Sequence, residues 1–132
     1  MLTAMRTAMA ALLLAVVSSS AMADWVELGS TPNGTLYAEP AIRMDGDRPK
    51  LWALNDFKTP QAFYEGTTFL SQKMQYEYDC MKSQYRLVYF SAYSGSMAEG
   101  EVVDFNIVPG EWQSIPPETG VEVTWKFACR KA

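Results

Sequence analysis

The sequence has no histidine and only two cysteines among its 132 residues. Histidine is the usual general base near neutral pH, so its absence excludes Ser-His-Asp triads and Cys-His nucleophile pairs. A metal site would also lack its commonest protein ligand, and two cysteines are too few to form one alone. We therefore expect a protein that is not an enzyme, with no catalytic residue, no metal and no cofactor.

Two acidic pairs are the remaining candidates for chemistry. Glu77 and Asp79 alternate along one predicted strand and could act as paired carboxylates. Asp45-Gly46-Asp47 resembles the start of a calcium loop, but the series of ligands does not continue as an EF-hand requires. We interpret the first pair as the solvated face of a strand and the second as a polar turn.

Basic residues are scarce and do not cluster along the sequence. The chain has 11 Lys and Arg against 15 Asp and Glu, which gives a formal net charge of −4 at pH 7. Phosphate contacts need concentrated positive charge, so we expect no nucleic-acid partner. No apolar run reaches the roughly twenty residues that cross a bilayer, and no cysteine stands where an N-terminal lipid would be attached. We therefore expect no transmembrane segment and no lipid anchor.

The first 23 residues have the pattern of a secretory signal peptide. Arg6 supplies a positive start, residues 8–17 form a short apolar run, and Ala21-Met22-Ala23 is a cleavage signal of the A-x-A type. We therefore predict that residues 1–23 are removed on export and that residues 24–132 form one domain. The sequence leaves open whether the exported domain is periplasmic, secreted or held at the cell surface.

Alternation of apolar and polar residues predicts an antiparallel sheet of about six strands. Asn33-Gly34 is a strong hairpin signal. Between residues 69 and 80, the face predicted to be buried carries Leu70, Met74, Tyr76, Tyr78 and Cys80. The face predicted to be solvated carries Ser71, Lys73, Gln75, Glu77 and Asp79. The remaining strands are predicted at residues 25–28, 35–38, 41–44, 49–57, 85–93 and 102–108.

The last segment, residues 119–131, fits two secondary structures. Val121, Trp125 and Cys129 recur every four residues and so share one helical face. The same segment also alternates in the way a strand does. We favour a helix because Thr119 and Glu122 match a capping box and because the segment ends on basic residues. The predicted fold class is therefore α+β, with a C-terminal helix packed on one face of the sheet.

Two cysteines in an exported chain predict one disulfide, between Cys80 and Cys129. The alternatives are two free thiols or a metal-binding pair, and a metal site would need more ligands than this chain offers. Both secondary structures place Cys129 on the side of Trp125, so the bond would fasten the last segment to the buried face of the sheet. Closing a loop of about fifty residues contributes roughly 4 kcal/mol of stability in the chain-entropy model.

Tyrosines are numerous and suggest a contact surface. Aromatic side chains fill cores, and tyrosine is also enriched at protein interfaces. We assign most of the aromatic rings to the core. For the rest we predict a partner-binding patch of Tyr76, Tyr78, Tyr85 and Tyr89, with Lys82 and Arg86 as a small basic rim. The alternative for the two basic residues is an ordinary charged turn.

Several segments resemble the surface-adhesin protein E-like family of bacterial exported proteins. They are "PKLWALNDFKTPQ" (49–61), "SQKMQYEYDC" (71–80) with "QYRL" after it, "GEVVDF" (100–105), "GEWQSIPPET" (110–119) and the terminal Cys129. The resemblance covers nearly the whole of residues 24–132. It implies an antiparallel sheet with a C-terminal helix tethered through Cys80 and Cys129. It also implies binding of host extracellular proteins at a cell surface.

These observations predict a small exported, non-catalytic binding protein that acts through protein–protein contacts and is adhesin-like. The alternative is a self-associating structural protein of the periplasm or envelope, forming a homodimer through a sheet edge near Leu36 or Val102. An enzyme acting on envelope polymers is a third hypothesis, for which the sequence offers no mechanism.

Overall fold

The computed structural model describes residues 24–63, 65–106 and 109–131. The predicted signal peptide at residues 1–23 lies outside the described residues, as do Tyr64, Ile107 and Val108. Within the described ranges, none of the helices is long and apolar enough to cross a membrane.

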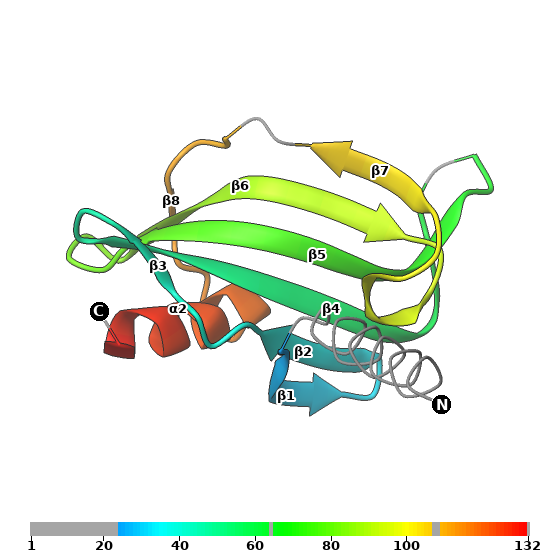
Figure 1. Ribbon diagram of the computed structural model, residues 1–132, viewed down its shortest axis with the longest axis horizontal. Coiled ribbons are helices and arrows are strands. Elements are labelled where there is room, and N and C mark those ends of the chain that lie inside the picture. The colour runs from blue at the N-terminus through cyan, green and yellow to red at the C-terminus, as the bar shows by residue number, and fades with distance from the viewer. Residues whose placement is uncertain (1–23, 64, 107–108, 132) are drawn as a thin grey trace, which may run out of the picture.

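An antiparallel sheet of eight strands dominates the fold, with the order β1-β2-β4-β5-β6-β7 (Figure 1). The short strands β3 and β8 lie off this path, paired with β4 and β6. The predicted antiparallel sheet with a C-terminal helix is therefore confirmed. The strands are β1 (Val26–Thr31), β2 (Gly34–Ala38), β3 (Arg43–Asp45), β4 (Arg48–Ala62), β5 (Thr68–Asp79), β6 (Gln84–Tyr93), β7 (Val102–Asn106) and β8 (Gln113–Ser114).

The last segment forms the helix α2 (Gly120–Lys131), so the strand alternative is excluded. The capping box explains where the helix begins. The Glu122 N–H donates to Thr119 Oγ1 at 3.3 Å, and Glu122 Oε1 accepts from the Glu118 N–H at 3.3 Å. The carboxylate thus reaches back one residue further than the usual box, which satisfies a backbone donor ahead of the helix.

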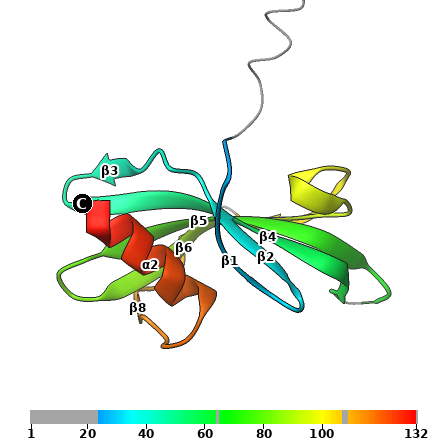
Figure 2. The same ribbon diagram turned by 90° about the horizontal axis from the view of Figure 1, so that it is seen from below.

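The helix covers one side of the sheet, and Figure 2 shows β3 and the 3-10 turn η1 (Ser96–Ala98) on the other side. We call these the covered face and the open face. The core lies between α2 and the covered face, where Leu51, Ala53, Tyr78 and Ala128 are fully buried. Each comes from an inward position of β4, β5 or α2, as the predicted alternation requires.

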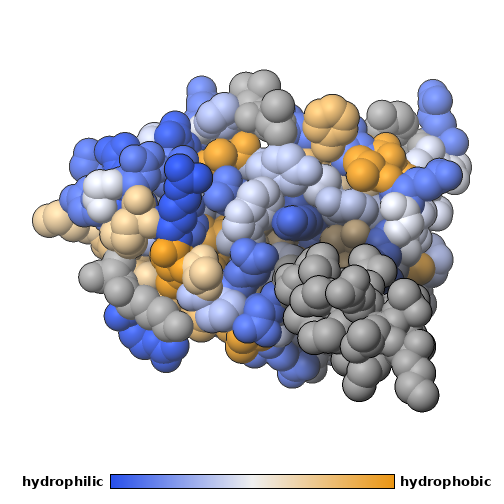
Figure 3. Space-filling view, in the orientation of Figure 1, coloured by the Kyte–Doolittle hydropathy of each residue, from blue (hydrophilic) through white to orange (hydrophobic). Residues whose placement is uncertain are grey.

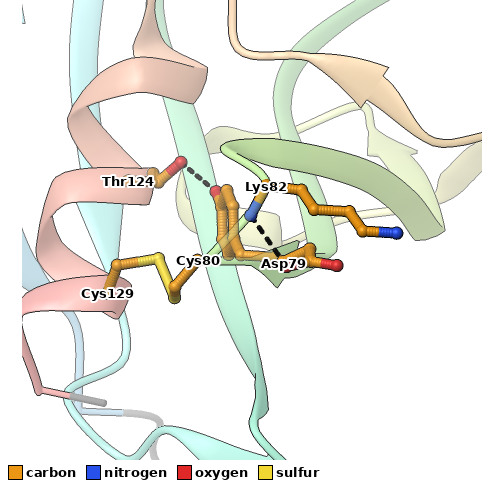
Figure 4. Close-up of a disulfide and its surroundings, with 6 residues drawn as sticks. Asp79, Cys80, Lys82, Thr124 and Cys129 are labelled. Atoms are coloured by element: carbon orange, nitrogen blue, oxygen red, sulfur yellow. Dashed lines mark hydrogen bonds between the residues drawn. A yellow bond between two sulfur atoms is a disulfide. The ribbon is translucent and has the colours of Figure 1, made fainter.

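The Cys80–Cys129 disulfide fastens α2 to the end of β5, as predicted (Figure 4). The two Cα atoms are 5.7 Å apart, and 49 positions separate the cysteines in sequence. The Tyr78 hydroxyl also forms a hydrogen bond with the Thr124 hydroxyl of α2. A covalent bond and a buried hydrogen bond therefore join the same two elements.

The prediction that alternate β5 residues are solvated is wrong at Glu77 and Ser71, which are 1% and 0% exposed. Glu77 is covered because it pairs with Arg86 on β6. Ser71 is covered by the turn between β6 and β7, because its hydroxyl donates to the Gly95 carbonyl at 2.6 Å and accepts from the Ala98 N–H at 2.9 Å. Alternation gives the face of a residue, but not what folds over that face.

Candidate binding surface

Three of the predicted patch residues, Tyr76, Tyr78 and Tyr85, meet on the covered face. The ring of Tyr76 lies 6.1 Å from that of Tyr78 and 5.8 Å from that of Tyr85. Tyr78 has no exposed surface because α2 packs over it. Burial, with Tyr85 adding to it, raises the pKa of Tyr76 to about 12, and burial raises the pKa of Tyr78 as well. These rings pack against one another beneath the helix.

The other predicted patch residues lie elsewhere. Lys82 is exposed in the turn after β5, where its backbone N–H donates to Asp79 Oδ1 at 3.0 Å. Arg86 lies on the open face, because it is opposite Glu77 whereas Tyr85 is opposite Tyr78. Neighbouring residues of a strand point to opposite faces, so Tyr85 and Arg86 cannot belong to one patch.

Tyr89 also lies on the open face, although Tyr85 and Tyr89 share the same parity in sequence. The cause is a β-bulge in β6. Tyr76 pairs with Leu87 but Gln75 pairs with Tyr89, so Val88 is the extra residue. A bulge shifts the strand by one residue and reverses which face the following side chains occupy. Sequence alternation gave no sign of this shift.

On the open face, β4, β5 and β6 place basic and aromatic side chains side by side. In the strand register Lys50 is opposite Glu77, which is opposite Arg86, while Trp52 is opposite Gln75, which is opposite Tyr89. Trp112, from the segment between β7 and β8, packs against Arg48 and Arg86. We define the open-face stripe as Arg48, Lys50, Trp52, Lys73, Arg86, Tyr89 and Trp112.

The rings of the stripe are held by cations and by one another. Arg48 Cζ and Arg86 Cζ lie 5.1 and 4.8 Å from the Trp112 ring centroid. Lys73 Nζ lies 4.6 Å from the ring of Trp52, and that ring meets Tyr89 edge to face at 5.1 Å. Each cation–π contact contributes about 0.5–1 kcal/mol at exposed sites. These contacts favour the observed positions of the side chains in the stripe.

The stripe is positively charged although the whole chain is acidic. Its cations are Arg48, Lys50, Lys73 and Arg86, and the carboxylates beside them on this face are Asp45, Glu77 and Asp79. Glu77 Oε1 accepts from Arg86 Nε at 2.7 Å, and Asp45 lies 3.7 Å from Lys50. Figure 3, which views the open face, shows blue hydrophilic side chains beside pale, near-neutral ones. Sequence analysis missed this stripe because its members are far apart in the chain.

Across the ranges that the structure describes, no three His, Cys, Asp or Glu side chains gather where they could hold a metal ion. The perturbed tyrosines, Tyr76 and Tyr78, face the core rather than a cleft. The arrangement of the stripe favours contact with another molecule through ring surfaces and positive charge.

Comparison with known proteins gives one family and one fold. The family model of surface-adhesin protein E matches residues 25–130. Two crystal structures of Haemophilus influenzae protein E have the same fold, each at 13% identity. The match to the first has a TM-score of 0.64 and covers 85% of this chain and 91% of the protein E chain. The match to the second, which comes from a non-typeable strain, has a TM-score of 0.58 and covers 84% of this chain and 78% of the protein E chain. No curated protein sequence matches the chain.

Proposed function

Because the chain belongs to the surface-adhesin protein E family, we propose that it is an exported, non-catalytic binding protein that docks a protein partner on the open-face stripe. The observation that carries this proposal is the packing of large aromatic rings among cationic side chains on the face that α2 leaves uncovered. Trp, Tyr and Arg are the residue types that supply most of the binding energy at protein interfaces.

The contacts within the stripe favour binding. Association costs about 0.5–1.5 kcal/mol for each flexible side chain that becomes fixed. The contacts of Trp112 with Arg48 and Arg86, and of Trp52 with Lys73, favour these side-chain positions before a partner binds. Ordering this surface on binding therefore costs less free energy than ordering lysine side chains that make no such contacts.

The charge of the stripe indicates what kind of partner fits. Complementary charge speeds association and disfavours partners of the same sign. Arg48, Lys50 and Lys73 would face an acidic segment that also presents a flat or apolar group to Trp52 and Trp112. Of the residues predicted from sequence, Arg86 belongs to this surface, and Lys82 would add charge at its edge.

Export is part of the same proposal. The signal peptide expected at residues 1–23 would carry the chain out of the cytoplasm. A disulfide such as Cys80–Cys129 persists in oxidising compartments, which include the periplasm and the medium. We propose one of these, or the cell surface, as the place where the domain meets its partner.

A binding experiment with charge-reversal variants tests the proposal. The purified exported protein is exposed to extracellular-matrix proteins and to bacterial envelope proteins, and the Kd is measured for any partner that is retained. We expect Arg48→Glu and Lys73→Glu each to raise the Kd for that partner at least about tenfold, which is about 1.4 kcal/mol of binding free energy. The matched control is Lys126→Glu on α2. No saturable partner in either pool, or an equal loss in the control, would refute the proposal.

Self-association through β7 is a second candidate, supported by a separate observation. β7 ends the strand order and carries two exposed apolar side chains, Val102 at 54% and Phe105 at 62%. An uncovered edge strand with apolar side chains is a template for pairing with another copy. Light scattering of the wild type and of Phe105→Glu tests this, since a wild type that stays monomeric at high concentration excludes it.

A further inference from the structure

A pocket of about 390 Å³ lies away from the open-face stripe. Its walls come from the β1–β2 hairpin, the middle of β4 and the start of α2. In Figure 2 the hairpin, which forms the β1–β2 end of the sheet, and the start of α2 both lie below β4. The volume lies within the range of about 300–1,000 Å³ that is usual for small-molecule sites.

The floor of the pocket is apolar and rigid. Leu36, Phe57 and Val123 line it, one from each wall. Leu36 also packs on the helix start, since a Cβ on Gly120 would lie 3.6 Å from Leu36 Cδ2. The hairpin and β4 approach so closely at Gly34 that a Cβ there would collide with the backbone of β4. Because paired backbone forms these walls, the pocket exists before any ligand arrives.

Acidic side chains line the pocket next to this floor. Asp56, Glu118 and Glu122 line it, and among the described residues that do so none is Lys or Arg. Asp56 Oδ1 already accepts from the Ser96 hydroxyl and the Met97 N–H, so Glu118 and Glu122 are the two carboxylates left for a ligand. The nearest paired cation is Lys126 Nζ, 3.9 Å from Glu122 Oε1, and its side chain is 68% exposed. Such an exposed pair is weak, so it leaves most of the negative charge of Glu122 uncompensated.

The helix start does not reverse this charge. A helix N-terminus is equivalent to about half a positive charge, which is smaller than the charge of two carboxylates. Two of its N–H groups are also satisfied within the chain, because those of Glu122 and Val123 donate to Thr119. An anionic ligand is therefore disfavoured.

Asn55 supplies one polar group that is available to a ligand. Asn55 lines the pocket, opposite Leu36 in the strand register. Within the described part of the chain its side-chain amide makes no hydrogen bond, although it is only half-exposed. An amide in this position can accept from an N–H group of a ligand.

We propose that this pocket binds a small organic ammonium ion, with its apolar group on Leu36, Phe57 and Val123 and its charged nitrogen beside Glu118 and Glu122. An apolar floor with a few convergent polar groups is the usual design of a small-molecule site. This site goes beyond the proposed function and does not depend on it, since it shares no residue with the open-face stripe.

The test uses two probes of similar size and opposite charge, 2-phenylethylammonium and 3-phenylpropanoate. Each is titrated into the purified exported protein while the NMR signals of the Leu36 and Val123 methyl groups are followed. We expect saturable shifts with the ammonium ion and an affinity at least tenfold weaker for the carboxylate. Equal affinities, or no shift with the ammonium ion, would overturn the proposal.

A charge-neutral variant separates the site from a general effect of an acidic protein. The double variant Glu118→Gln/Glu122→Gln should lower the affinity for the ammonium ion at least tenfold. The side-chain amide oxygen at position 122 can still accept from the backbone N–H of residue 118. The control Glu101→Gln, on the loop before β7, should leave the affinity unchanged. A thermal melt confirms that each variant is folded. If the double variant binds as well as the wild type, the proposed role of the carboxylates is wrong.

Discussion

The two members of the Glu77–Arg86 ion pair are buried to different degrees, so we expect removal of either one to lower the unfolding free energy by different amounts. The Glu77 side chain is 2% exposed and that of Arg86 is 30% exposed. Replacing Arg86 by Met removes the cation that pairs with this nearly water-free carboxylate. Breaking a buried pair in this way costs about 3–5 kcal/mol. That is a large part of the roughly 5–15 kcal/mol that stabilises a small domain.

The reverse replacement should cost much less. In Glu77→Met the guanidinium of Arg86, whose side chain is 30% exposed in the wild type, can still be hydrated. The double variant Glu77→Met/Arg86→Met replaces the pair by apolar side chains of similar size, which is often neutral or stabilising. We therefore expect the second mutation, Glu77→Met, to restore stability to the damaged Arg86→Met protein.

Urea unfolding of the wild type, both single variants and the double variant measures this directly. The expected order of unfolding free energy places Arg86→Met lowest, with the double variant about 2 kcal/mol or more above it. Lys126→Met is the control for an exposed pair and should change stability by less than about 0.5 kcal/mol. A double variant no more stable than Arg86→Met would show that Glu77 does not depend on Arg86.

Three further predictions concern the covered face. Replacing Cys80 and Cys129 together by Ser should lower the unfolding free energy by about 4 kcal/mol, and equal urea midpoints for oxidised wild type and this variant would contradict it. Tyr78→Phe should cost about 1 kcal/mol, since Thr124 loses a buried hydrogen bond, and an unchanged melting temperature would count against that bond. The pKa of Tyr76 is raised to about 12 in the folded protein, so on raising the pH the unfolded chain loses the Tyr76 proton before the folded chain does. The unfolding free energy that is present below pH 10 should therefore fall by about 3 kcal/mol between pH 10 and 12. The Tyr76→Phe variant should lack this part of the decrease.

Features that depend on near neighbours in sequence were predictable. The capping box of Thr119 and Glu122 predicted the start of α2, and the presence of two cysteines predicted the disulfide. The alternation of β5 correctly placed Tyr76 and Tyr78 on the buried face. Each of these inferences needs only the local geometry of a helix or strand, or the chemistry of two residues.

The candidate binding surface depends on long-range geometry and could not be read in the same way. Trp112 lies in an irregular segment, and nothing local shows that it crosses to Arg48 and Arg86. The bulge at Val88 moves Tyr89 to the face opposite Tyr85, which broke the predicted tyrosine patch. The signal that could have helped was the alternation of Arg48, Lys50 and Trp52, which places two cations and a ring on one face of β4.

The two faces of the sheet are stabilised by different means, and this bears on function. On the covered face, stability comes from the helix, the disulfide and the fully buried Tyr78. On the open face, the buried Glu77 holds Arg86, and Arg86 in turn supports Trp112. Because this second set of contacts does not involve α2, loss of the disulfide should weaken the domain without rearranging the stripe. Sequence changes can therefore alter the open-face stripe while the tethered helix keeps the sheet folded.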